Sequence, residues 1–334
     1  MLILSAQDQA RALAMPEAIE AVGEALSHFS GGRANVPLRT GIPVPEQGAT
    51  ALFMPALVAG AGSLGVKYVS VFPRNAGRDK PVIHGAVLLA DPETGEPLAL
   101  LEGSYLTALR TGAASGLATR YLARPDAAVA AIIGTGTQAR MALRAVAAVR
   151  RLREVRLYNR RREKAETFAR ELAAQLGPEV PRLQVSPDPG EAVRGADIVV
   201  TATTSHTPVF PAGAVGTGVH ICAIGSFRPD MQEVPGEVVA RADKVVVESR
   251  EAALAEAGDL LIPIREGLWE AGRLHAELGE IHSGHRPGRE RADELTLFKS
   301  VGLAVMDVVV GRRIYERARQ LGIGQEVDLG VFPS

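Results

Sequence analysis

An apolar strand that runs directly into a glycine-rich turn and a helix constrains this chain more than any other feature. Residues 127–133 are apolar, the turn reads Gly134-Thr-Gly136-Thr-Gln-Ala139, and residues 141–149 carry apolar side chains at helical spacing. In such a unit the first glycine allows a tight turn, the second lets the backbone approach a pyrophosphate, and the small third residue permits close packing. The helix N-terminus adds N–H groups and the positive end of a dipole. The pattern predicts a Rossmann-type dinucleotide site, with a plain strand–turn–helix as the alternative.

The second half of this unit indicates which dinucleotide is bound. The next strand, 155–158, is followed by Asn159, Arg160 and Arg161, whereas NAD-binding chains usually place Asp or Glu there for the ribose 2′-hydroxyl. An amide can donate a hydrogen bond, and guanidinium groups bind phosphate oxygens in charge-assisted pairs. The sequence therefore favours NADP, with NAD still possible. The alternative is a solvated basic turn before a helix over 163–176.

Charge and cysteine content limit the classes of partner. The 334 residues include 37 basic and 38 acidic side chains, for a net charge of −1, so nucleic acid and anionic membrane surfaces are not expected as partners. The longest apolar stretches have strand length, and no targeting segment is recognisable. The single cysteine, Cys222, lies in an apolar stretch and is expected to be a core residue. We expect a cytoplasmic protein with a small-molecule partner.

The N-terminal third reads as an α+β segment. Ser5 to Asp8 resembles a capping box, and a helix is expected from Pro16 to a Gly31-Gly32 stop. Four strands are predicted, with Asp91 to Gly95 as the turn of a hairpin. A helix over 102–122 follows and ends before Pro125. The expected strands are 51–54, 64–72, 82–90 and 98–101.

Beyond residue 125 strands alternate with helices or loops, which predicts a doubly wound parallel sheet. Besides the strands that end at 133 and 158, those expected are 196–203, 219–224 and 244–248. A last helix over 297–321 has an apolar face and is expected to return to the first domain. The predicted fold is therefore α/β: a Rossmann domain over 125–301 and a discontinuous α+β domain over 1–124 and 302–334. Residues 282–291 are expected to form a surface loop.

Three basic side chains of the first domain are candidates for an anion pocket: Arg39, Lys67 and Arg110. Only five lysines occur in the chain, and Lys67 lies within an apolar strand. Burial would lower its pKa and make it a candidate proton donor. The alternative is that these long side chains are solvent-exposed, with Lys67 extending to the surface.

Several separated motifs together resemble the ornithine cyclodeaminase/mu-crystallin family across nearly the whole chain. They are Gly62-Ser-Leu-Gly-Val-Lys67-Tyr-Val-Ser, Leu109-Arg110-Thr-Gly, Ile133-Gly-Thr-Gly-Thr-Gln138, Tyr158-Asn-Arg160, Gly225-Ser-Phe-Arg-Pro-Asp230 and Thr296-Leu-Phe-Lys-Ser300-Val-Gly. The resemblance implies a homodimer whose discontinuous domain pairs the subunits and holds substrate, while the Rossmann domain holds the cofactor.

The resemblance also implies roles for individual residues. Arg39 and Arg110 would hold the carboxylate of an amino or imino acid, and Lys67 would lie beside the reacting carbon and nitrogen. For His84 a core position is the alternative. With the glycine turn and the basic residues after it, the residues expected along the dinucleotide are His84, Thr111, Gly134, Thr135, Gly136, Thr137, Gln138, Asn159, Arg160, Arg161, Thr203, Gly225 and Ser300.

One departure from the family pattern separates the possible reactions. Ornithine cyclodeaminases carry an acid/base Asp after a Gly-Gly pair, and Phe227 occupies the corresponding place here. Cyclodeamination needs a positioned base for its proton transfers, whereas reduction of a preformed cyclic imine needs a carboxylate clamp and one proton donor. The Ser-x-Arg-Pro-Asp version also resembles the mu-crystallin branch, whose activity is ketimine reduction.

We therefore expect NADPH-dependent reduction of a small cyclic ketimine, of the pyrroline- or piperideine-2-carboxylate type, to an L-imino acid. The alternatives are conversion of ornithine to proline and ammonia, alanine dehydrogenation, and a non-catalytic NADPH or small-molecule carrier. No metal is expected, because His275, His282 and His285 lack the spacing of metal ligands. No Gly-x-Ser-x-Gly nucleophile motif is present either.

Overall fold

The computed structural model describes residues 1–176 and 181–330 and divides the chain into two compact units. Unit 1 comprises residues 1–110 together with the chain from 303 onward, and unit 2 comprises residues 111–302. The chain passes between them within one helix, α3 (Gly103–Leu122), and again after Gly302. The domain boundary expected after residue 124 lies beyond the end of that helix and stays a prediction.

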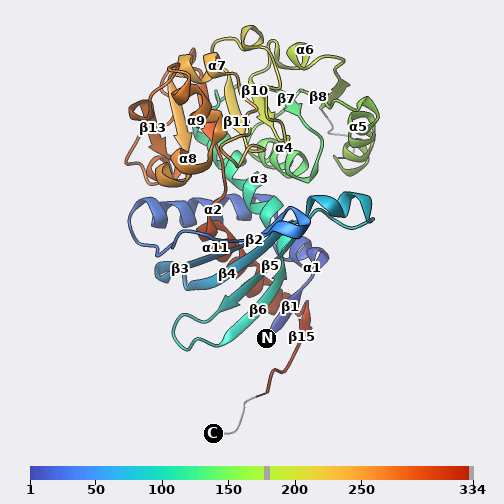
Figure 1. The fold of residues 1–334 in the computed structure, drawn as a ribbon, viewed down its shortest axis with the longest axis vertical. Helices are drawn as coiled ribbons and strands as arrows, with labels where there is room; N and C mark the ends of the chain where they lie inside the picture. The colour runs from blue at the N-terminus through green and yellow to red at the C-terminus, as the bar shows by residue number, and fades with distance from the viewer. Residues whose placement is uncertain (177–180, 331–334) are drawn as a thin grey trace. The chain divides into compact units, whose positions relative to one another are not determined.

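Unit 1 is built on one mixed sheet with the strand order β15-β1-β6-β5-β4-β3-β2 (Figure 1). Strand β1 pairs in parallel with β6, and the other neighbours are antiparallel. Its strands are β1 (Leu2–Leu4), β2 (Thr40–Val44), β3 (Ala49–Val58), β4 (Ser63–Val71), β5 (Ile83–Ala90), β6 (Pro97–Glu102) and β15 (Gln325–Glu326). The predicted hairpin turn at 91–95 joins β5 to β6, as expected.

The helices of unit 1 cover one face of this sheet. They are α1 (Ala6–Ala12), α2 (Met15–Ser30) and α11 (Ala304–Leu321). Helix α11 packs on β3, β4 and β5 and also against α1 and α2. The predicted capping box of Ser5 and Asp8 opens α1, and Pro16 lies in the first turn of α2.

The predicted final helix begins too early. Residues 297–303 are not helical: Thr296–Lys299 form a strand, β14, and the helix starts at Ala304. Leu297 and Phe298 fit a helical apolar face as well as a buried strand, so periodicity could not separate the two. Gly302 has a left-handed φ of +85°, so a helix that began at residue 297 would be interrupted there.

Unit 2 is a sheet of eight strands that are all parallel, in the order β13-β12-β14-β11-β10-β7-β8-β9. The doubly wound α/β architecture is confirmed. The strands are β7 (Val129–Ile133), β8 (Glu154–Tyr158), β9 (Arg182–Val185), β10 (Ile198–Thr201), β11 (His220–Ala223), β12 (Lys244–Val247), β13 (Leu274–Glu277) and β14. Strands β9, β13 and β14 were not predicted.

Helices cover both faces of this parallel sheet. One face contributes Val199, Ile221 and Val245 to a core shared with α6, α7, α8 and α9. The other face presents Cys222 to the 111–122 part of α3, where Thr119 and Ser115 lie within 3.8 Å of its sulfur. The helices are α4 (Thr137–Val149), α5 (Arg162–Leu176), α6 (Pro189–Val193), α7 (Gly236–Arg241), α8 (Arg250–Glu256), α9 (Gly258–Arg265) and α10 (Leu278–His282).

Cys222 is a core residue, as predicted. Its side chain is fully buried, and burial raises the pKa of the thiol to about 12, so it remains protonated and apolar in character. None of the helices within residues 1–176 and 181–330 is long and apolar enough to cross a membrane.

Candidate substrate and cofactor sites

Unit 1 contains a buried cluster of two cations and one carboxylate. Lys67 comes from β4, Arg110 from α3 and Asp307 from the first turn of α11. The Lys67 Nζ lies 2.7 Å from one oxygen of Asp307, and the Arg110 Nε lies 3.1 Å from the other. The three residues are 2%, 4% and 0% exposed, so all three charged groups are removed from solvent. The alternative that Lys67 extends to the surface is wrong.

Close packing of α11 on β4 creates this cluster. Gly65 lies two residues before Lys67, on the same face of β4, and a Cβ there would come within 2.4 Å of the Leu88 backbone and 3.3 Å of Val308. A side chain at position 65 would therefore clash with the backbone of β5 and crowd Val308 of α11. The missing side chain lets the first turn of α11 bring Asp307 within hydrogen-bonding distance of Lys67.

Cations outnumber the carboxylate in this cluster. The pKa of Lys67 is lowered to about 8, chiefly because burial disfavours the charged amine. Asp307 raises that pKa, while Arg110 and Arg39 lower it, which places the charge of half-buried Arg39 near the ammonium. The Arg110 Nη1 is buried and has no hydrogen-bond partner among the described residues. Such an unpartnered guanidinium nitrogen, with excess positive charge around it, suits an anionic ligand.

Sequence reasoning named both cations of this cluster, together with Arg39 nearby, and missed Asp307. The available signal was a single acid within the otherwise apolar run 303–310 of a helix, facing a single lysine in an apolar strand. A buried charge needs a partner, so each of these residues could have predicted the other. His84 lies elsewhere on the sheet, on β5 opposite Ser70, and is exposed, so the alternative of a core histidine is wrong.

In unit 2 the glycine turn joins β7 to α4 in the way the motif requires. Gly134 has a φ of +101°, and a Cβ there would lie 2.5 Å from the Ala202 carbonyl oxygen. A Cβ on exposed Gly136 would meet nothing within 4 Å, so this part of the turn is open. Ala139 is fully buried between helix and sheet. No side chain in the described chain caps α4, which leaves its first N–H groups for an anion, and Thr137 and Gln138 form its first turn.

The end of β8 lies beside the glycine turn. The Asn159 amide donates a 2.7 Å hydrogen bond to the Thr135 hydroxyl and accepts one of 3.0 Å from the Arg161 N–H. Arg160 and Arg161 have exposed side chains. A cleft borders this corner, with Thr135, Arg140 and Phe168 among its lining residues. The residues present fit a dinucleotide with its pyrophosphate at α4 and its adenosine ribose near Asn159.

A buried carboxylate that sequence reasoning missed joins the carboxyl ends of β10 and β11. One oxygen of Glu233 accepts hydrogen bonds from the Thr203 N–H and hydroxyl, at 2.6 and 2.8 Å. The other accepts from the N–H groups of Gly225 and Ser226, at 2.7 and 3.0 Å. Burial raises the pKa of Glu233, and the nearby Asp259 carboxylate raises it further. The expected cofactor residues Thr203 and Gly225 are therefore fixed to each other.

Two further buried charges complete this arrangement. Asp259 accepts from the backbone N–H of Glu233 at 2.6 Å, and its second oxygen lies 2.9 Å from Lys299 Nζ. Lys299 in turn donates to the Ser226 carbonyl oxygen at 2.5 Å. The backbone of Ser226 is therefore bound by Glu233 at its N–H and by Lys299 at its carbonyl oxygen. The next residue, Phe227, has a partly exposed side chain.

A second glutamate, Glu248, follows β12 and binds two residues that follow β14. The Ser300 hydroxyl donates to Glu248 at 2.7 Å, and the Gly302 N–H donates to the same carboxylate at 2.8 Å. Both Ser300 and Glu248 are buried. Thr111, at the start of unit 2, is also buried, and its carbonyl accepts from the Ser115 hydroxyl at 3.2 Å. The residues expected on the cofactor thus lie at the carboxyl ends of adjacent strands, on the glycine turn and on α3, apart from His84, which belongs to unit 1.

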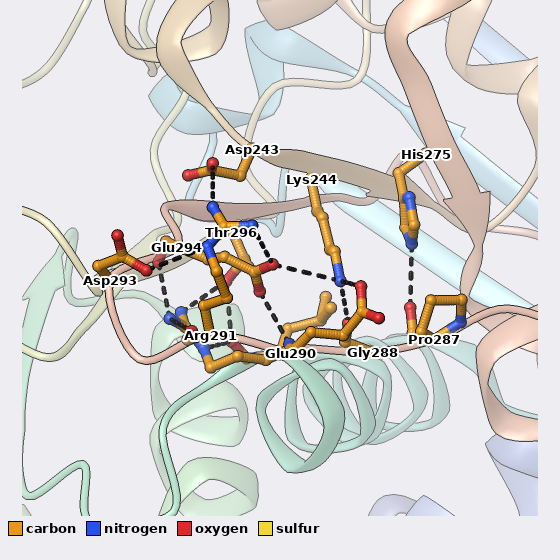
Figure 2. A network of polar contacts seen from close by, with 12 residues as sticks. Asp243, Lys244, His275, Pro287, Gly288, Glu290, Arg291, Asp293, Glu294 and Thr296 are labelled. Atoms are coloured by element: carbon orange, nitrogen blue, oxygen red, sulfur yellow. Dashed lines mark hydrogen bonds and ion pairs between the residues drawn. The ribbon is translucent and has the colours of Figure 1, made fainter.

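The opposite, amino-terminal edge of the sheet carries a different polar network (Figure 2). Lys244 of β12 lies 2.6 Å from Glu290 and 3.4 Å from buried Glu294, and Arg291 lies 3.0 Å from Asp243. These contacts fix much of the expected 282–291 loop at the edge away from the glycine turn.

The histidines near this loop have partners other than a metal. His275 bonds to the Pro287 carbonyl oxygen at 2.9 Å, His282 to the Tyr121 hydroxyl at 2.9 Å, and His285 to Ser283 at 2.9 Å. Within residues 1–176 and 181–330, no three His, Cys, Asp or Glu side chains are grouped as a metal would require.

Comparisons with known proteins agree along the whole length of the chain. A sequence model of the ornithine cyclodeaminase/mu-crystallin family matches residues 1–322. The chain is 51% identical over 328 residues to a Delta(1)-pyrroline-2-carboxylate reductase of Bacillus cereus, covering 98% of this chain and 100% of that protein. The Thermococcus litoralis Delta(1)-pyrroline-2-carboxylate reductase in complex with NADH and L-proline is similar in structure, with a TM-score of 0.93 and 42% identity over 98% of this chain and 100% of that one. An archaeal alanine dehydrogenase dimer with bound NAD gives a TM-score of 0.91 and 35% identity over 99% of each chain.

Proposed function

Because the chain belongs to the ornithine cyclodeaminase/mu-crystallin family, we propose that it reduces a small cyclic ketimine to the L-imino acid, with Δ1-pyrroline-2-carboxylate as substrate and L-proline as product. It is an NAD(P)-dependent oxidoreductase that acts on a carbon–nitrogen bond. The buried Lys67–Asp307–Arg110 cluster is the observation that carries the proposal. It combines an anion site with a proton donor, and a 2-carboxy imine needs both.

The carboxylate of the substrate pairs with the guanidinium groups of unit 1. Arg110 offers the buried Nη1 that lacks a partner in the described chain, and Arg39 adds positive charge to the same cluster. A guanidinium fixes a carboxylate in a defined plane, so the imine bond beside that carboxylate is also oriented. Arg110 therefore contributes alignment rather than chemistry.

Lys67 supplies the proton that the reaction consumes. Reduction adds a hydride to the imine carbon and a proton to the imine nitrogen, and the reduced nicotinamide supplies the hydride when it is bound. With a pKa of about 8, the Lys67 Nζ is mostly protonated at neutral pH and still acidic enough to release its proton. The same ammonium can hydrogen-bond the nitrogen before transfer.

We further propose that NADPH is preferred to NADH. Asn159 stands where NAD-specific chains place a carboxylate, and its amide is already oriented by Thr135. Arg160 and Arg161 are exposed beside it and would pair with a 2′-phosphate. Asn159 carries no charge, so it does not repel a 2′-phosphate as a carboxylate would.

Full cyclodeamination is disfavoured because Phe227 takes the place of the family's acid/base Asp. An aromatic ring can neither take up the proton released when the amine is oxidised nor return one to the departing ammonia. Asp230 does not replace that Asp, since both of its oxygens are bound by Arg228, at 3.0 and 2.7 Å.

We propose that two copies of the chain pair through the exposed face of the unit 1 sheet. Phe53 of β3 and Tyr68 of β4 lie opposite each other there, with ring centroids 5.4 Å apart, and each is 37% exposed. Exposed aromatic pairs of this kind are typical of the centre of a protein interface. The similar archaeal alanine dehydrogenase is a dimer.

A cytoplasmic location stays a prediction from the sequence.

A spectrophotometric assay tests the proposed function. Enzyme, NADPH and Δ1-pyrroline-2-carboxylate should consume NADPH and form L-proline in equal amounts. Piperideine-2-carboxylate tests the ring size, and NADH in parallel tests the preference for NADPH. Proline formed from ornithine with only a trace of cofactor would instead identify a cyclodeaminase. Oxidation of NADH that depends on pyruvate and ammonia would identify an alanine dehydrogenase, and cofactor binding without turnover would identify a carrier.

A further inference from the structure

We infer that Asp307 is a positioning residue for imine reduction: its single carboxylate holds the Lys67 ammonium and the Arg110 guanidinium in place together. This inference rests on the proposed function, because Lys67 and Arg110 are taken as the groups that contact substrate. Asp307 is contributed by α11, near the C-terminal end of the chain, and is 240 residues from Lys67 and 197 from Arg110 in sequence.

The geometry divides the two oxygens of Asp307 between the two cations. One oxygen accepts from Lys67 Nζ at 2.7 Å, and the other accepts from Arg110 Nε at 3.1 Å. The bond to Nε uses the inner edge of the guanidinium and leaves Nη1 without a partner in the described chain. A carboxylate that bound the two terminal nitrogens instead would occupy the donors that a substrate carboxylate needs. Asp307 therefore fixes the arginine without blocking it.

The charge of Asp307 matters because it is the carboxylate that faces Lys67. The charged groups near the ammonium are Asp307 from α11, Arg110 from α3 and Arg39 from the segment before β2. Met54 of β3 and Val87 of β5 flank Lys67 in register, and neither titrates. Without Asp307, a buried lysine would face two arginines, and its pKa would fall further below 8. The lysine would then be neutral at the pH where it must donate a proton.

Stability alone gives no reason for this arrangement. Taking charges out of water costs free energy, and replacing a buried ionic cluster by apolar residues is often neutral or stabilising. The rest of the first two turns of α11, including Val305, Val308 and Val309, is apolar and buried. A charged side chain in this stretch is therefore better explained by what it does for its two partners.

The test compares the pH dependence of kcat/KM for imine reduction in wild type and Asp307→Asn. In the wild type, kcat/KM should fall above pH 8. In the variant the same fall should begin at least one pH unit lower, and KM should rise because Arg110 is no longer fixed. Asp307→Glu, which keeps the charge, should keep the fall near its wild-type pH. The control Glu102→Gln removes a carboxylate that caps α3, at 2.8 Å from the Ser104 N–H, without touching Lys67, and should not move the fall.

A second measurement does not depend on turnover. With only five lysines, 13C labelling at Cε gives few NMR signals, and Lys67→Met assigns the one of interest. That signal should titrate near pH 8 in the wild type and at least one unit lower in Asp307→Asn. An unchanged pH profile together with an unchanged Lys67 titration in Asp307→Asn would overturn the inference. If the variant does not fold, the wild type alone decides, and a Lys67 that titrates near 10.5 would overturn the inference. A wild-type enzyme that does not reduce the imine would overturn the proposed function instead, while the NMR titration would still test the link between Asp307 and Lys67.

Discussion

Among single residues, Lys67 matters most, because the proposed reduction depends on its protonation. Its folded pKa of about 8 lies below the ordinary value of 10.5, because burial and two arginines outweigh the attraction of Asp307. The protonated form is the donor, so the active fraction is nearly complete at pH 7 and decreases as pH rises through 8. The direction of this change separates a proton donor from a general base, whose activity would rise over the same range.

We therefore predict that kcat/KM for imine reduction falls about tenfold per pH unit above pH 8. Lys67→Met should lower kcat/KM by about 100-fold or more, which is the usual contribution of a positioned acid. The affinity for NADPH, measured by fluorescence, should not change. Lys80→Met, at an exposed lysine of the same unit, is the control. Activity that stays constant to pH 10, or survives in Lys67→Met, would show that another group provides the proton.

A second residue-scale prediction concerns Asn159. Asn159→Asp should reverse the ratio of kcat/KM for NADPH and NADH, because the new carboxylate accepts from a ribose 2′-hydroxyl and repels a 2′-phosphate. Arg170→Ala, at an exposed arginine of α5 that bonds to Thr167, should leave that ratio unchanged. If the ratio stays constant in Asn159→Asp, the 2′ position is recognised elsewhere.

At the scale of the elements, buried acids organise the carboxyl ends of the strands. Glu233 joins the ends of β10 and β11 through four hydrogen bonds, and Glu248, which follows β12, binds Ser300 and Gly302 after β14. A carboxylate accepts hydrogen bonds at both of its oxygens, whereas an amide has one acceptor oxygen and presents an NH2 donor in place of the other. The loops that carry Thr203, Gly225 and Ser300 are thereby fixed before any ligand binds.

We predict that Glu233→Gln weakens cofactor binding specifically. The amide NH2 would face backbone N–H donors, and leaving such buried groups unpaired costs about 1–3 kcal/mol of the free energy of unfolding. The Kd for NADPH should rise several-fold. Glu294→Gln is the matched control, because Glu294 is also buried in unit 2 but lies in the network of Figure 2, at the other edge of the sheet. The control should lose similar stability in urea and keep its Kd. Equal changes of Kd in both variants would mean that loss of stability alone weakens binding.

The sequence predicted elements where a local signal was strong and failed where it was ambiguous. The strand–turn–helix around Gly134 and the hairpin turn at 91–95 contain turn residues that are each typical of one local structure. Strand β14 was missed because Leu297 and Phe298 fit either a strand or a helix, and the short strands β9 and β13 carry no long apolar run. Asp307 and Glu233 were missed for a different reason. Asp307 has partners 240 and 197 residues away, and Glu233 binds mainly backbone N–H groups, so no local pattern indicates either set of contacts.

At the scale of the whole molecule, the chain is expected to act as a dimer. Phe53→Glu with Tyr68→Glu should place two like charges opposite each other on adjacent strands of the proposed interface and separate the subunits. Light scattering after gel filtration should give twice the 35.2 kDa chain mass for wild type and one chain mass for the double variant. Leu268→Glu, at an exposed leucine of unit 2, is the control. A monomeric wild type, or a double variant that remains dimeric, would exclude this face as the interface.

We propose that this protein transfers a hydride from a reduced nicotinamide to the carbon of a carboxylate-bearing imine. Mass spectrometry of the product tests it directly, with NADPH deuterated at both C4 positions and unlabelled Δ1-pyrroline-2-carboxylate as substrates. We expect L-proline with one deuterium at Cα for each NADPH oxidised, formed about 100-fold or more slowly by Lys67→Met. Proline without deuterium, or NADPH that keeps both deuterium atoms while the imine persists, would contradict it.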